Sequence, residues 1–419
     1  MFPIFDLLPL IFKSLFSVFE EKIFWIFIVI VVLLYRKMGT MSRHLFKTSG
    51  ETPWRLILLA LFSGIMGGFV GSILLVFVGV SVNKIGGFYL LFTALGLMLI
   101  QQRFLCFAYA GGVLSLTYLF FGFPQISVPQ VMALVAVLHL VEALLIYLTG
   151  SICPLPIYVK NKEGRVVGGY NLQKFWPLPL VVFFVGVYPE PDVVKGLFSM
   201  PDWWPLIKPE LGVRGGELVY SMLGIPAVLG YGDIAMTTTP RVKTRRAAWE
   251  LAGYSVLLLG LAVAASYVAP LAYVAALFGP LGHEAIIYWG YKREVSGEPL
   301  YVPVERGLKL LHVRMGSPLA KAGVRAGDIF VTVNGLPVHD EWELQRAVLA
   351  GTSETLHKLE YACGEHPADE QGKTRQTVVK CKAGEAWGHI PVPEWYTGKY
   401  LYISASASLL KRWWKKITG

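Results

Sequence analysis

Residues 305–338, ERGLKLLHVRMGSPLAKAGVRAGDIFVTVNGLPV, decide the fold of the C-terminal part of this chain. The apolar positions between Leu308 and Val313 predict a strand, and Gly316–Pro318 predicts a turn that enters a short helix. A second apolar stretch, Ile329–Val333, predicts another strand, and Asn334–Gly335 after it is typical of a hairpin turn. The pattern therefore predicts a small α+β domain.

This pattern closely resembles the bacterial type of PDZ domain, over residues 300–385 with a helix near 340–350. Such a fold binds a peptide by adding it as a strand to an exposed sheet edge. The resemblance implies that the loop at 306–308 receives a C-terminal carboxylate, that strand 308–313 pairs with the peptide, and that the helix forms the far wall. The expected peptide-binding residues are Arg306, Gly307, Leu308, Lys309, Leu310, Leu344 and Val348. Arg306 is alternatively a solvated surface residue.

The charges of the chain are unevenly distributed. Apolar residues make up 54% of its 419 residues and charged residues only 16%, against roughly 25% in a soluble domain. Residues 1–300 hold 22 Lys/Arg and 16 Asp/Glu, whereas the 119 residues of 301–419 hold 16 and 12. We expect a membrane domain followed by a soluble domain. The net charge of +10 then indicates contact with an anionic membrane and no nucleic-acid partner.

The membrane domain is predicted to be α-helical and polytopic. The multi-span membrane domain is expected at 23–293, and residues 1–22 before it are expected to form an interfacial helix. The apolar run of this first segment is interrupted by Lys13 and is too short to span a bilayer. Gly64, Gly67, Gly68 and Gly71 form a GxxxG series that allows helix backbones to approach closely. Eight or nine spans are expected, at 23–35, 56–82, 85–101, 104–123, 131–148, 176–188, 217–236, 247–268 and 270–290.

Basic residues in the loops predict the orientation in a bacterial cell membrane. One set of alternate loops, which adjoins the soluble domain, carries 16 Lys/Arg and the other carries 6. Because basic loops stay in the cytoplasm, the PDZ domain and the C-terminus are expected there. Nine spans place the N-terminus outside, and eight place it inside. The basic set comprises loops 36–55, 101–103, 149–175, 237–246 and 291–293.

The tail at 386–419 is basic and aromatic, and it ends in LLKRWWKKITG. On a helix, this composition suits contact with the anionic inner leaflet. A disordered tail and a ligand for the chain's own PDZ groove are the alternatives.

Ionisable residues inside predicted spans are site candidates, because each costs roughly 2.5–3.5 kcal/mol on insertion. They serve either as interhelical hydrogen-bonding groups or as a polar route in a transporter or envelope sensor. They are His139, Glu142, Glu217, Asp233, Glu250, His283 and Glu284.

A site-2 type intramembrane zinc metalloprotease is the enzymatic alternative, and the sequence disfavours it. Its HExxH motif needs two histidines one turn apart, but here Ile287 follows His283–Glu284 at the second position. The four cysteines, Cys106, Cys153, Cys363 and Cys381, form no CxxC pair and are expected to be reduced thiols. No catalytic residue, metal site or cofactor is therefore expected.

The whole chain resembles the MinJ-type polytopic PDZ proteins of Gram-positive division-site placement. The resemblance rests on the tract 282–287, its continuation through 292–294 into 304–307, the multi-span N-terminal part and Pro391–Pro393. It implies a membrane-anchored, non-enzymatic adaptor that links division-site proteins at the pole or septum through the PDZ groove. The residues alone indicate a membrane-anchored peptide-binding module, and its oligomeric state stays open.

Overall fold

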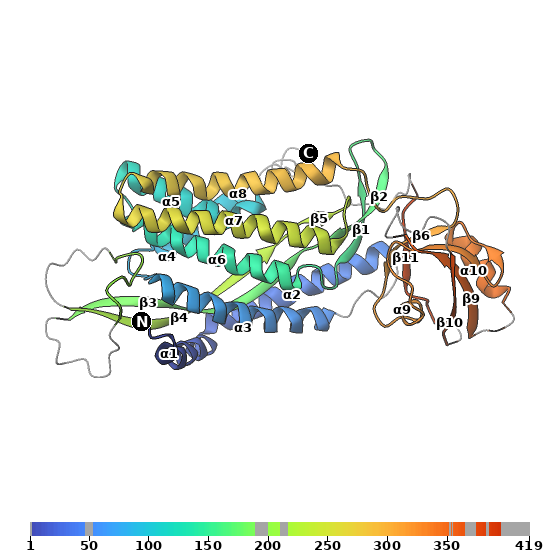
Figure 1. The fold of residues 1–419 in the computed structure, drawn as a ribbon, viewed down its shortest axis with the longest axis horizontal. Coiled ribbons are helices and arrows are strands. Elements are labelled where there is room, and N and C mark those ends of the chain that lie inside the picture. Colours follow the sequence, from blue (N-terminus) through green and yellow to red (C-terminus); the bar gives the residue numbers. More distant parts are fainter. Residues whose placement is uncertain are drawn as a thin grey trace, which may run out of the picture.

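The computed structural model describes residues 2–46, 53–188, 200–209, 217–351, 353, 355–364, 374–382 and 385–394. A layer of long helices lies beside a long hairpin, and the C-terminal α+β domain sits at one end of both (Figure 1). The N-terminus lies at the opposite end (Figure 1). Residues 395–419, which hold most of the predicted membrane-binding tail, lie outside the described residues.

Five helices of the described chain are long and apolar enough to cross a membrane: α2, α3, α6, α7 and α8. Two further helices, α4 and α5, lie within the predicted spans 85–101 and 104–123 but have only 14 and 15 residues. A helix also forms where the interfacial helix was expected. The helices are α1 (Ile4–Ser17), η1 (Val18–Glu20), α2 (Lys22–Phe46), α3 (Pro53–Val78), α4 (Gly87–Ile100), η2 (Gln102–Leu105), α5 (Phe107–Phe121), α6 (Val128–Thr149), α7 (Pro240–Tyr267) and α8 (Leu271–Ser296).

The predicted spans 176–188 and 217–236 are wrong as helices. They form strands β3 (Lys174–Tyr188) and β4 (Glu217–Tyr231), paired antiparallel over all 15 residues. A continuous apolar run is equally typical of a span and of a fully buried strand, and β-branched and aromatic residues with internal prolines favour the strand. The expected eight or nine helical spans are therefore not confirmed.

The outer edge of β3 packs against the glycine series of α3. Pro177 and Pro179 have no N–H to satisfy on this edge. Their carbonyl oxygens face Gly64 and Gly68, where an added Cβ would lie 2.1 Å from each oxygen. The small residues thus admit a strand edge, where the sequence predicted a second helix.

The remaining outer-edge N–H groups of β3 between residues 175 and 185 also have partners. Unpaired backbone groups are costly in a bilayer, and each of these N–H groups donates a hydrogen bond to an acceptor outside the hairpin. The bonds run from Phe175 N to Tyr35 Oη (3.1 Å), Val181 N to Ser72 Oγ (2.9 Å), Phe183 N to Val80 O (3.0 Å) and Val185 N to Asn83 Oδ1 (2.8 Å).

The C-terminal domain is a sheet with the strand order β10-β9-β7-β6-β11, to which β8 is added beside β7. Ser317 and Asp340 cap its two helices by accepting from the backbone N–H three residues ahead. Its sheet continues to Pro391, six residues beyond the predicted boundary at 385, because Trp387 is part of the core. The elements are β6 (Leu308–Val313), α9 (Pro318–Lys321), β7 (Ile329–Val333), β8 (Leu336–Pro337), α10 (Glu341–Leu349), β9 (Leu356–Ala362), β10 (Thr374–Lys380) and β11 (His389–Pro391).

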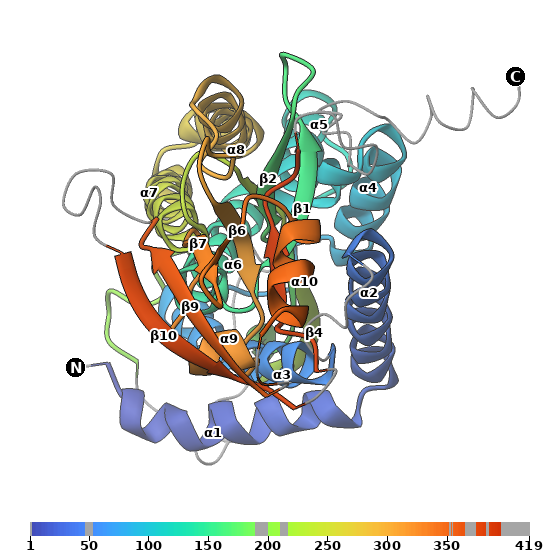
Figure 2. The ribbon, with the colours of Figure 1, turned by 90° about the vertical axis from the view of Figure 1, so that its right-hand side faces the viewer.

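A small sheet lies at the end of the helical layer that adjoins this domain (Figure 1), and its strands β1 and β2 are seen behind the domain in the end-on view (Figure 2). It consists of β1 (Leu155–Lys160), β2 (Val166–Asn171) and β5 (Ile234–Ala235). The Tyr158 hydroxyl donates to Pro391 O at 2.8 Å, and the Tyr170 hydroxyl donates to Leu311 O. These bonds fix the C-terminal domain against the end of the helical layer.

Candidate functional site

The expected peptide-binding region contains a cavity of about 380 Å³. It lies between the loop before β6, the start of α10 and the segment that contains β11. Gly307 shapes this loop with a φ of +91°, and an added Cβ would lie 2.5 Å from Phe330 O. Only glycine fits this position without moving the strand.

The expected peptide-binding side chains divide into core and surface. Leu308, Leu310 and Leu344 are 6%, 0% and 2% exposed and belong to the core of the domain. Arg306 is exposed, and Val348 is half-buried against the core. The leucines therefore hold the strand and the helix in place, while Arg306 remains at the surface and the buried Gly307 lines the cavity.

Lys309 points away from that core and lines the cavity. Its Nζ donates to Leu300 O at 2.9 Å, and burial lowers the pKa of Lys309. The ammonium group therefore places positive charge beside this cavity.

Sequence reasoning missed that β11 covers the edge of β6. His389 pairs with Val313, and Val392 N donates to Lys309 O at 3.0 Å. His389 Nε2 also lies 3.0 Å from Glu341 Oε2 at the start of α10. The segment thus lies between strand and helix, where an added peptide strand was expected. The three-residue length of β11 gave no periodic signal.

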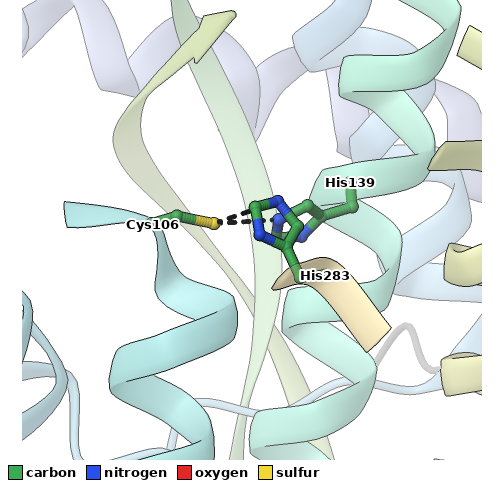
Figure 3. A group of neighbouring side chains, drawn as sticks. All are labelled: Cys106, His139 and His283. Atoms are coloured by element: carbon green, nitrogen blue, oxygen red, sulfur yellow. Dashed lines mark hydrogen bonds between the residues drawn. The ribbon is translucent and has the colours of Figure 1, made fainter. Parts of the chain in front are cut away.

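A second cluster lies inside the helical layer, where Cys106, His139 and His283 meet (Figure 3). Cys106 Sγ is 3.0 Å from His139 Nε2 and 3.8 Å from His283 Nε2. The two histidines are the twelfth of 22 residues in α6 and the thirteenth of 26 in α8. The cluster therefore sits half-way along both helices.

The half-length helices α4 and α5 bring Cys106 to this depth. They form a hairpin whose tip, η2, ends inside the layer, so the predicted loop 101–103 lies beside α8 and not at the domain end. Gly112 on α5 lies against Pro280 of α8, where an added Cβ would be 2.5 Å from Pro280 Cδ. This close approach draws α5 toward His283.

Polar groups flank the cluster. The Tyr109 hydroxyl donates to Glu284 Oε2 at 2.5 Å, and Arg103 forms an ion pair with Glu284 at 2.9 Å. The sequence predicted no metal site, because zinc sites are recognised in a sequence by short spacings between their ligands. Cys106, His139 and His283 are 33 and 144 residues apart and come from separate elements.

Comparison with known proteins identifies the C-terminal domain. Residues 298–371 match the family of the PDZ domain. This part of the chain is a PDZ domain. It is also 38% identical over 68 residues to a putative serine protease, HhoA of Synechocystis, an alignment that covers 16% of this chain and 17% of HhoA. That likeness concerns the PDZ domain alone.

A second relative matches most of the chain. The cell division topological determinant MinJ of Bacillus subtilis is 25% identical over 363 residues, which cover 80% of this chain and 85% of MinJ. The similarity therefore includes the helical layer as well as the PDZ domain. The chain thus resembles MinJ over most of its length, and it combines a PDZ domain with five helices long and apolar enough to cross a membrane among its described residues.

The predicted intramembrane carboxylates do not converge on one polar route. Glu217 begins β4 opposite Tyr188, at the end of the hairpin away from the PDZ domain. Glu250 forms an ion pair with Arg293 at 2.6 Å on the surface of α7 and α8. Glu142 lies on α6, one turn beyond His139. This separation does not favour the transporter alternative.

A buried ionic cluster near the PDZ domain was only partly anticipated. Lys243, 5% exposed, lies 3.2 Å from Asp233 and 3.5 Å from Glu294. Glu294 also accepts from the backbone of Met236 and Thr237. The sequence predicted Asp233 in a span and Lys243 in a basic loop. The contact between Lys243 and Glu294 fixes the start of α7 to the end of α8, which leads into the PDZ domain.

Proposed function

We propose that this chain is a membrane-anchored adaptor that captures a protein partner through its PDZ domain and acts in division-site placement. The similarity to MinJ over 80% of the chain, combined with the PDZ domain, carries this proposal. No enzymatic role is included. The HExxH motif lacks its second histidine, since Ile287 stands there, and the likeness to HhoA is confined to 68 residues.

The partner segment is proposed to enter the cavity beside Gly307 and Lys309 and to continue along β6. Arg306, Lys309 and the backbone of the loop 306–308 would receive its carboxylate, and Val348 would line the α10 side. Leu308, Leu310 and Leu344 would support these groups from the core. A partner that extends along β6 must displace β11 from this edge.

Localisation and capture of partners test the proposal together. A fluorescent fusion of the full chain is expected at the septum or the poles, and crosslinking in native membranes is expected to capture division proteins. A chain that ends after Glu298 keeps the helical layer and lacks the PDZ domain, so it should lose these partners. If the shortened chain kept the same partners, the membrane half and not the PDZ domain would be the part that recognises them.

A point substitution separates the groove from general surface charge. Arg306→Glu should weaken capture about tenfold or more, because it places an anion beside the entering carboxylate. Lys321→Glu makes the same charge change at another exposed position, whereas Arg306 directly precedes the cavity-lining residues Gly307 and Leu308. Equal capture by both variants would contradict the role of the groove.

The cytoplasmic location of the PDZ domain belongs to the same proposal. The 16-to-6 distribution of Lys/Arg between the two sets of loops supports it. A reporter fused after Gly419 that is active only outside the cytoplasm should stay silent. Activity of this reporter would show that the PDZ domain lies outside the cytoplasm, and it would exclude cytoplasmic division proteins as partners of that domain.

A further inference from the structure

We propose that Cys106, His139 and His283 bind one zinc ion and so connect α5, α6 and α8 in the middle of the helical layer. The three ligand atoms lie within 4.8 Å of one another. Thiolate and imidazole are the donors that zinc prefers in proteins. Among the described residues, this is the group of three such donors close enough to share an ion.

The two sulfur–nitrogen distances fit a tetrahedral site after small adjustments. Zinc–sulfur and zinc–nitrogen bonds of about 2.3 and 2.05 Å place sulfur and nitrogen about 3.5 Å apart around one ion. The observed separations from Sγ are 3.0 Å to His139 Nε2 and 3.8 Å to His283 Nε2. Shifts of about 0.5 Å, within the reach of side-chain rotation, convert one arrangement into the other.

The hydrogen bond of His139 prepares it as a ligand. Its Nδ1 lies 2.7 Å from Val135 O. Because a carbonyl oxygen only accepts, Nδ1 carries the hydrogen, and the lone pair of Nε2 faces Cys106. A second bond of this kind fixes the orientation of most metal-binding histidines.

His283 is poorly satisfied without an ion. Its Nδ1 is buried and has no partner in the described part of the chain, and its Nε2 has only the long contact to Cys106. A buried ring with so little hydrogen bonding is costly. Ligation of zinc by Nε2 replaces the long contact to Cys106 with a strong bond, and Nδ1 then carries the hydrogen of the ring.

Cys106 is the N-cap of α5, and its sulfur accepts from Ala108 N at 3.4 Å, so its position at the start of the helix is fixed. The thiolate is the form of cysteine that binds zinc. With zinc bound, three protein ligands leave a fourth position for water or another donor.

Metal analysis and cobalt substitution of the purified full chain test the site. We expect about one zinc per chain after dialysis. Replacement by Co²⁺ should produce the near-ultraviolet thiolate charge-transfer band and the visible bands of a tetrahedral site. Cys106→Ser and His283→Ala should abolish the charge-transfer band and lower zinc at least tenfold, whereas Cys153→Ser, at a buried thiol outside the cluster, should retain both.

The wild-type chain keeps the test decisive where a variant fails to fold. Zinc below about 0.1 per chain in wild type, together with no cobalt–thiolate band after reconstitution, overturns the proposal. A variant with Cys153, Cys363 and Cys381 replaced by serine retains Cys106 alone. Zinc should protect this thiol from a maleimide, and unchanged labelling in the presence of zinc also overturns the site.

Discussion

The two largest antiparallel sheets of this chain protect their strands in different ways. In the PDZ domain, buried and exposed residues alternate along β9, and the edge of β6 is covered by another strand, β11. In the membrane half, β3 is buried on both faces, and its edge is covered by α3. On the β3 edge beside α3, N–H groups that a soluble sheet could leave to water are satisfied by groups of the protein itself.

The largest effect is expected from Leu308→Asp in the PDZ domain. Leu308 is 6% exposed, so the new carboxylate would be buried without a partner, at a cost of about 4 kcal/mol or more. Hydrogen exchange of the β6 and β7 amides should accelerate strongly in the full chain. Lys321→Asp, at an exposed position, is the control and should exchange like wild type. Slow exchange in Leu308→Asp would show that this strand tolerates charge on its inner face.

Gly68→Ala tests the contact between α3 and β3. The added methyl group would lie 2.1 Å from Pro179 O, and such overpacking costs about 2–3 kcal/mol. Thermal unfolding in detergent should occur at a lower temperature than in wild type. Gly96→Ala on α4 is the matched control, because its Cβ meets open space and alanine favours the helix. Equal midpoints for the two variants would mean that β3 does not depend on close approach.

Ser72→Ala tests a single hydrogen bond on the same edge. The Ser72 hydroxyl accepts from Val181 N at 2.9 Å, and its loss leaves a buried N–H unpaired, at about 1–3 kcal/mol. Ser115 is the matched control, because its buried hydroxyl has no partner in the described part of the chain. Thermal unfolding should show destabilisation by Ser72→Ala and little change, or a gain, in Ser115→Ala. The reverse order would contradict the account of the edge.

The smallest effect concerns pH and the attachment of β11. Burial acts to raise the pKa of Glu341, but the hydrogen bond and charge of His389 outweigh it and hold that pKa below its usual 4.5. A depressed carboxyl pKa stabilises the fold above about pH 4.5, and this contribution is lost as the pH falls below that value. Because Glu341 is half exposed, we expect less than about 1 kcal/mol.

Hydrogen exchange of the β11 amides between pH 3 and 6 measures this effect after correction for intrinsic exchange. Protection should fall below about pH 4.5 in wild type, whereas Glu341→Gln should lack this step. An identical profile in the variant would assign the pH dependence to another group.

The sequence predicted the PDZ domain well because its turns depend on local chemistry. Gly307, Gly323 and Gly335 have φ values of +91°, +88° and +81°, which few other residues adopt. The long helices followed from their apolar length. Hydrophobicity could not distinguish the strands β3 and β4 from helical spans, since neither strand alternates between apolar and polar residues. The prolines at 177, 179 and 226 were the available signal.

The candidate sites were less accessible to sequence reasoning. Arg306 and Gly307 could be placed by motif, but the burial of Leu308 and the position of β11 depend on tertiary packing. His139 and His283 were recognised as site candidates because ionisable residues inside spans raise the free energy of membrane insertion. Cys106 was interpreted as a reduced thiol that packs like a small apolar residue. Their meeting depends on a half-length helical hairpin, which apolar runs of ordinary length do not reveal.

The paired strands of β3 and β4 constrain how the chain is assembled in the bilayer during synthesis. A single strand that left the translocation machinery alone would carry unpaired N–H and C=O groups into hydrocarbon, at several kcal/mol each. Pairing satisfies these groups between the two strands, and the hairpin is complete only after the 28 residues between Tyr188 and Glu217 have been made. Helix α3, with the glycines that receive the β3 edge, is synthesised earlier. The order of synthesis thus supplies the covering surface before the hairpin that needs it.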